Sequence, residues 1–126
     1  MILVDTSVWI EFFRVHSPVF EQLRNLIEEE RIVAVECVFG ELLQGARNRS
    51  EREFIIKYWE ALPKIDEAGL WIRAGRLSGE HSWKSSGLGL IDAFLAAAAK
   101  TKGIPLWSTD KSLRLVLSAK ECYAPD

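Results

Sequence analysis

Three short runs of apolar residues, each followed by polar side chains, place the strongest constraint on the fold of this 126-residue chain. They are Ile2–Val4, Ile32–Val35 and Ile104–Trp107. Each run is continuous rather than alternating, which is typical of parallel strands covered on both faces of a sheet. Weaker strand patterns occur at 64–65 and 122–123. These segments predict a small, mostly parallel sheet.

Helical patterns separate the strands. The start signals are Ser17-Pro18, a capping box opened by Ser50, and Asp66, and another helix is expected at 88–102. Strands that alternate with helices predict an α/β domain with helices on both faces of a mostly parallel sheet. No linker or shift in composition divides the chain, so residues 1–126 are expected to form one domain.

Composition excludes several classes of protein. The hydrophobic share of 48% excludes disorder, and the net charge of −2 argues against a strongly basic nucleic-acid-binding surface. Cys37 and Cys122 lack the close spacing of a zinc motif, and two cysteines alone do not indicate a disulfide framework. The N-terminus lacks the basic segment of a signal peptide, and no apolar stretch is long enough to span a bilayer. A cytoplasmic protein outside the membrane is therefore expected.

Two acidic residues follow predicted strands. Asp5 comes directly after Ile2–Val4, and Asp110 comes shortly after Ile104–Trp107. Since ligands of open α/β sheets bind at the carboxyl ends of the strands, both carboxylates are expected at one edge of the sheet. The alternative is that each aspartate only caps the N-terminus of a helix.

Asp92 lies on what should be the buried face of its helix. Its helical neighbours Leu88, Leu95, Ala96 and Ala99 are all apolar. A carboxylate on such a face must be paired, hydrogen-bonded or bound to a metal. The alternative is a buried aspartate that caps a neighbouring loop.

Glu41 completes a set of four acids. It follows the run at 32–35 by about one helical turn, and no basic residue is close in sequence. Alone, it is explained equally well as a half-exposed helical glutamate. Four converging carboxylates repel one another and need a cation, and oxygen ligands suit Mg²⁺ or Mn²⁺. Such a site is typical of metal-assisted phosphodiester hydrolysis.

Four segments in this order resemble the PIN-domain nucleases, and the length and layout resemble the VapC-type toxins of toxin–antitoxin systems. The segments are Val4–Ile10, Glu41–Gly45, Leu90–Ala98 and Leu106–Asp110. The resemblance implies a three-layer α/β/α sandwich with strand order 3-2-1-4-5. It also implies a catalytic quartet that binds Mg²⁺ or Mn²⁺, formed by Asp5, Glu41, Asp92 and Asp110.

The same resemblance implies an endoribonuclease that cleaves cellular RNA and inhibits translation. It further implies a homodimer and a cognate antitoxin that occupies the site and binds operator DNA. Hydroxyl residues often stand beside the first and fourth acids of the family, and Thr6, Ser7 and Thr109 are expected to support the carboxylates here. The family often has an aromatic residue at the position of Leu113, a difference expected to alter packing and not chemistry.

Four further residues are candidate contacts with RNA or the antitoxin. Arg14, Arg47 and Arg49 are suited to phosphate groups, and Trp83 to an interface or to the substrate. A solvated loop explains the arginines at 47 and 49 as well.

Two other functions stay open. A phosphatase-type metal-dependent hydrolase also begins with an aspartate after its first strand, but its pattern requires a second aspartate where this chain has Ser7. A non-catalytic binding module of the same fold is disfavoured only by the complete set of four acids.

Overall fold

The computed structural model describes residues 1–125, and its sheet is parallel, as the sequence predicts. The strand β1 (Ile2–Val4) lies between β2 (Ile32–Val33) and β3 (Leu106–Trp107). In the register of the sheet, Leu3 is opposite both Val33 and Leu106. All strand residues are buried, which explains why their apolar runs are continuous.

The two weaker strand patterns form only single bridges at the outer positions of the sheet. Ala34 bridges to Lys64, and Leu106 bridges to Cys122, both in the parallel sense. The regular strands have the order β2-β1-β3, so the five-strand order 3-2-1-4-5 stays a prediction. β3 is shorter than its apolar run, and Pro105, which has no N–H to donate, contributes only its carbonyl, to Leu3 N.

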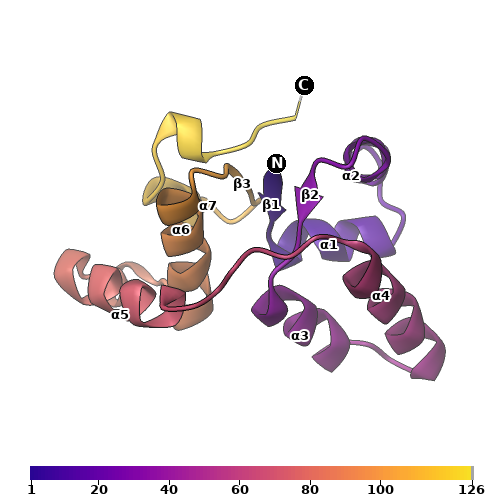
Figure 1. Ribbon diagram of the computed structural model, residues 1–126, viewed down its shortest axis with the longest axis horizontal. Helices are drawn as coiled ribbons and strands as arrows, with labels where there is room; N and C mark the ends of the chain where they lie inside the picture. The colour runs from indigo at the N-terminus through magenta and orange to yellow at the C-terminus, as the bar shows by residue number, and fades with distance from the viewer. Residues whose placement is uncertain (126) are drawn as a thin grey trace.

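Two groups of helices flank the sheet (Figure 1). One group contains α1 (Thr6–Phe13), α2 (Val19–Glu28), α3 (Glu36–Gln44) and α4 (Arg49–Ala61). The other contains α5 (Leu70–His81), α6 (Leu90–Lys102) and α7 (Lys111–Leu115). Short 3₁₀ helices occur at Lys84–Ser86 and Ala119–Glu121. The α/β class is therefore confirmed.

Several helix starts differ from their sequence signals. Pro18 rather than Ser17 stands at the cap position of α2, and α6 begins at Leu90 rather than at residue 88. The cap of α4 is Asn48 rather than Ser50, and its side chain accepts a hydrogen bond from Glu51 N at 2.9 Å. Asp66 instead accepts from Ala68 N at 3.0 Å, and α5 begins after Gly69, whose φ is 76°. At the starts of α4 and α5 more than one residue can cap, and the path of the chain decides between them.

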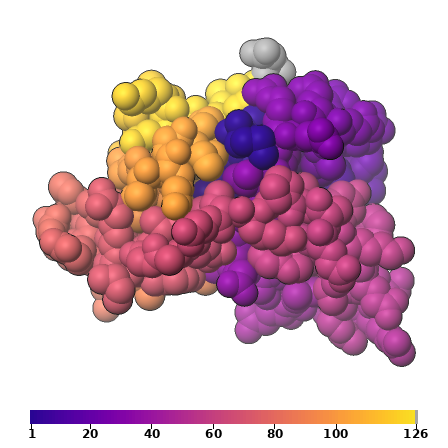
Figure 2. Space-filling view, in the orientation of Figure 1, coloured from indigo at the N-terminus to yellow at the C-terminus, as the bar shows by residue number. Residues whose placement is uncertain are grey.

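The segment between α4 and α5 crosses the face of the molecule and covers the junction of the two helix groups (Figure 2). From this segment, Glu67 accepts a hydrogen bond from Glu36 N at 2.9 Å, at the first residue of α3. The cap residue Val35 has no side-chain acceptor, so Glu67 performs that role from a distant part of the chain.

The core differs between the two sides of the sheet. On the α1 side, aromatic rings cluster around Trp9, which contacts Phe12, Phe13, Phe39 and Tyr58. On the other side, α6 supplies an unbroken buried segment from residue 93 to residue 99. Within residues 1–125, no helix is long and apolar enough to cross a membrane.

Candidate metal and nuclease site

Asp5 is held at the point where β1 passes into α1. It is 7% exposed and caps α1, with Oδ1 accepting from Thr6 N at 2.7 Å. Its Oδ2 accepts from Ser108 Oγ at 2.7 Å and from Ser7 Oγ at 3.1 Å. All three donors are neutral, and none of the ion pairs in the described chain includes Asp5. The carboxylate is thus oriented but not neutralised.

Asp110 lies beside Asp5 because β3 pairs directly with β1. It caps the short helix α7, and its Oδ1 accepts from Ser112 N at 2.8 Å and from Leu113 N at 3.3 Å. Both aspartates are therefore helix caps, as the alternative interpretation proposed. Capping occupies Oδ1 of each residue, and a cap at the edge of a sheet can still offer carboxylate oxygen to a ligand.

Ser108 connects the two aspartates and is not among the site residues predicted from the sequence. Its hydroxyl donates to Asp5 and accepts from Asp110 N at 3.0 Å, and the residue is 7% exposed. Thr109 was the expected partner, but it lies exposed, and only its backbone N–H makes a contact, with Ser7 Oγ at 3.4 Å. The signal was available in the strand period, because residue 108 follows a buried strand and precedes Asp110 by two positions.

Glu41 reaches the same region from α3. Thr6 Oγ1 donates to Glu41 Oε1 at 2.7 Å, across 35 positions of sequence. Thr6 also donates its backbone N–H to Asp5, so this residue links two of the four acids. Thr6 and Ser7 thus both donate hydrogen bonds to these carboxylates, and their supporting role at a metal site stays a prediction.

Asp92 lies in the first turn of α6 and is half-buried. Burial raises the pKa of its carboxyl above the usual range, and the negative charges of Asp5, Asp110 and, more weakly, Glu41 raise that pKa further. A hydrogen bond with the Gly89 backbone acts in the opposite direction. The other three acids are therefore close enough to Asp92 to act on its carboxyl electrostatically.

The donor set suits a hard divalent cation, although its ligands are not drawn together. Within residues 1–125, no group of three or more acidic, histidine or cysteine side chains is arranged as a ready metal cage. Mg²⁺ usually keeps several waters and takes only one or two carboxylates directly. Oxygen donors that repel one another, without a basic partner, fit such an ion.

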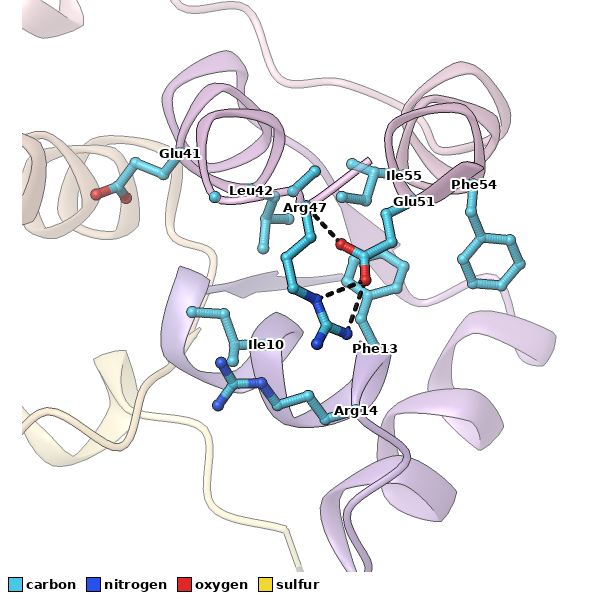
Figure 3. Close-up of a pocket in the computed structure, with 11 residues that line it drawn as sticks. Ile10, Phe13, Arg14, Glu41, Leu42, Arg47, Glu51, Phe54 and Ile55 are labelled. Atoms are coloured by element: carbon cyan, nitrogen blue, oxygen red, sulfur yellow. Dashed lines mark hydrogen bonds and ion pairs between the residues drawn. The ribbon is translucent and has the colours of Figure 1, made fainter. Parts of the chain in front are cut away.

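The three arginines proposed as contacts differ in their ion pairs. Arg14 is exposed at the end of α1, while Arg47 and Arg49 form i,i+4 ion pairs with Glu51 and Glu53. Arg14 and Arg47 both line one pocket, which Glu41 also borders (Figure 3).

Trp83 was expected at an interface or against the substrate, and this prediction is wrong for the structure described. The residue is only 6% exposed and belongs to the core, and its ring also stacks with that of the exposed His81 at 5.9 Å between centroids. A polar loop surrounds it in sequence, but an indole this large is buried wherever packing permits.

Comparison with known proteins assigns the family. The profile of the PIN domain matches residues 2–116. Two similar proteins are VapC ribonuclease Mb1587 of Mycobacterium bovis and ribonuclease VapC11 of Mycobacterium tuberculosis. Each is 33% identical over 92 residues, which cover 64% of this chain and 68% of the relative.

Two solved structures share the fold. PAE2754 from Pyrobaculum aerophilum has a TM-score of 0.65 and 18% identity, over 97% of this chain and 88% of that one. FitAcB from Neisseria gonorrhoeae has a TM-score of 0.59 and 19% identity, over 92% of each chain. The chain belongs to the PIN-domain family, and its relatives of known sequence include VapC ribonucleases.

Proposed function

We propose that this protein is a divalent-metal-dependent endoribonuclease and the toxin of a toxin–antitoxin system, with residues 1–126 as its single catalytic domain. The observation that supports the proposal is a chain of contacts: Ser108 links Asp5 to Asp110, Thr6 links Asp5 to Glu41, and Asp92 is near enough for the charges of these three acids to act on it. The ribonuclease assignment is supported by the VapC relatives.

The electrostatics support a cation at this place. None of the ion pairs formed within residues 1–125 includes any of the four acids. Burial first, and then repulsion by the neighbouring carboxylates, raises the pKa of Asp92, so a positive charge among the carboxylates would stabilise its ionised form. In this proposal the four side chains hold Mg²⁺ or Mn²⁺, some of them through water.

Each residue then has a distinct task. Asp5 is the best-oriented ligand, because three hydrogen bonds hold its carboxylate. Ser108 and Thr6 set its position relative to Asp110 and Glu41. When bound, Mg²⁺ or Mn²⁺ lowers the pKa of a water molecule and offsets the negative charge of the phosphodiester.

The proposal includes three kinds of partner. The substrate is RNA, and a cognate antitoxin covers the site and connects the protein to operator DNA. A homodimer is the expected assembly. These assignments rest on the resemblance to VapC-type toxins and on the relatives named VapC.

A cleavage assay tests the function. Structured RNA is incubated with the full chain in Mg²⁺, in Mn²⁺ and in chelator, beside Asp5→Asn, Asp92→Asn and the control Glu28→Gln. Glu28 is an exposed acid at the end of α2. Cleavage should require metal and fall more than about 100-fold in both aspartate variants, because loss of groups that only support a ligand costs 10- to 100-fold.

Two outcomes would replace the proposal. Cleavage that survives either aspartate substitution, or that continues in chelator, contradicts the carboxylate–metal mechanism. A folded protein that binds Mn²⁺ but cuts no RNA is a binding module, and hydrolysis of p-nitrophenyl phosphate in its place indicates a phosphatase-type hydrolase.

A further inference from the structure

A pocket between α1, α3 and α4 adjoins the acidic site (Figure 3). Its volume is about 490 Å³, within the range of ~300–1,000 Å³ found for small-ligand sites. Six apolar side chains line it: Ile10, Phe13, Leu42, Ala46, Phe54 and Ile55. Phe54 is 50% exposed and Ile10 is 37% exposed, so apolar surface meets solvent here without a partner.

Two arginines border the same pocket. Arg14 comes from the end of α1, and Arg47 comes from the connection between α3 and α4. Glu51 orients Arg47 by accepting from Nε at 3.0 Å and Nη2 at 2.8 Å. A guanidinium has five N–H donors, so Arg47 keeps donors for an anion. Figure 3 shows both guanidinium groups on one side of the pocket, near Ile10.

Glu41 connects the pocket to the acidic site. It lines one end of the pocket, and it accepts the hydrogen bond from Thr6 next to Asp5. A polymer with its reacting phosphate at the four acids would therefore place a neighbouring unit in the pocket. That unit would meet an aromatic surface and two cations.

We propose that this pocket binds the nucleotide adjacent to the scissile phosphate of single-stranded RNA. The base lies against Phe13 and Phe54, and the next phosphate contacts Arg14 and Arg47. This inference rests on the proposed function, since it takes RNA hydrolysis at the acids as given. Unstacked bases characteristically pack on aromatic rings in this way, with arginine at the backbone.

Charge and size favour a nucleotide over a peptide segment. Arg14 forms no ion pair within residues 1–125 and can meet a phosphodiester, and Arg47 keeps unused N–H donors beside its ion pair with Glu51. The volume of about 490 Å³ is that of a small-ligand site. Stacking accepts every base, so the pocket would set affinity and influence the choice of cleavage position without reading one sequence.

Binding is measured by fluorescence anisotropy with 12-nucleotide homopolymers of A, C and U, and cleavage of a mixed-sequence single strand is followed in Mg²⁺. The pocket variants are Phe54→Ala and Arg14→Ala. Ile72→Ala and Arg73→Ala are matched controls, because both residues are exposed on α5. Each pocket variant should weaken RNA binding and raise KM about tenfold with kcat changed less than twofold, which corresponds to ~1.4 kcal/mol per tenfold.

A covalent probe and a conservative variant extend the test. RNA with 5-iodouridine should crosslink on irradiation to the peptide that contains Phe54, and Phe54→Tyr should retain binding and crosslinking because it retains the ring. Unchanged binding, KM and crosslinking in the pocket variants overturn the proposal. Normal RNA binding by these variants together with lost affinity for a peptide partner would also overturn the proposal.

The binding and crosslinking arms separate this proposal from the proposed function. If the wild-type protein cuts no RNA but its pocket crosslinks to RNA and the variants lose binding, the pocket assignment stands and the catalytic one fails. If the wild-type protein cuts RNA and the pocket variants behave as the controls do, the catalytic assignment stands and the pocket assignment fails.

Discussion

Replacing Ser108 with alanine removes the hydroxyl that contacts both Asp5 and Asp110. The residue is 7% exposed, and its Oγ donates to Asp5 Oδ2 at 2.7 Å while it accepts from Asp110 N at 3.0 Å. A hydrogen bond to a charged group contributes ~1.5–3 kcal/mol, and an ordinary one ~1 kcal/mol. Asp110 is exposed, so water can replace the second bond.

The expected loss of stability in Ser108→Ala is therefore ~1.5–3 kcal/mol, most of it from the bond to Asp5. The hydroxyl also holds the carboxylate in place, so affinity for Mn²⁺ should fall by about 10- to 100-fold, as for other residues that orient metal ligands. Thr109→Ala is the matched control. Its side chain is exposed and should change stability by less than about 0.5 kcal/mol.

Urea unfolding measures the first effect, and calorimetric titration with Mn²⁺ measures the second. The same substitution is then made in Asp5→Asn. If Ser108 acts through the charge of Asp5, the two changes should not be additive, and Ser108→Ala should cost much less in that background. Equal unfolding midpoints and equal Mn²⁺ affinity for Ser108→Ala and Thr109→Ala would refute the reasoning.

Three other outcomes are expected elsewhere in the chain. Glu67→Gln removes the negative charge beside Glu36 N at the start of α3 and should cost ~0.3–1 kcal/mol in urea unfolding, whereas an unchanged midpoint would exclude capping by charge. Gly103→Ala should lower the melting temperature through a cost of about 1 kcal/mol, because φ is 65° there and an added Cβ meets no atom within 4 Å; an unchanged temperature would show that no strain arises. Burial, then the charges of Glu67 and Glu41, raise the pKa of Cys37 to about 12. At pH 8 only about one Cys37 in ten thousand is a thiolate, so alkylation by iodoacetamide should be far slower than in the urea-unfolded chain, and equal rates would contradict this.

Local patterns predicted the elements that depend on local interactions. The apolar run at Ile2–Val4 forms a strand, and Asp5 after it reaches the edge of the sheet. Gly103 also stands at the C-terminal cap of α6, where a glycine commonly ends a helix. The pattern did not select the cap of α4, since both Asn48 and Ser50 are favourable N-cap residues and only the chain path selects Asn48.

Local patterns did not predict the contacts between segments that are distant in sequence. The Ser108–Asp5 hydrogen bond spans 103 positions, and the Thr6–Glu41 bond spans 35. Trp83 lies in a polar segment whose composition suggests exposure, yet its ring is buried. No periodicity within one element encodes these pairings.

The sequence by itself determined the α/β class and the positions of the four acids along the chain, because strand and helix periods and residue chemistry are local properties. Tertiary structure decided which groups meet. Parallel pairing of β1 with β3 brings Ser108 and Asp110 to Asp5, and packing of α6 against the sheet raises the pKa of Asp92 among its neighbours. The physical reason is that burial and charge interaction depend on distance in space, which long-range packing sets.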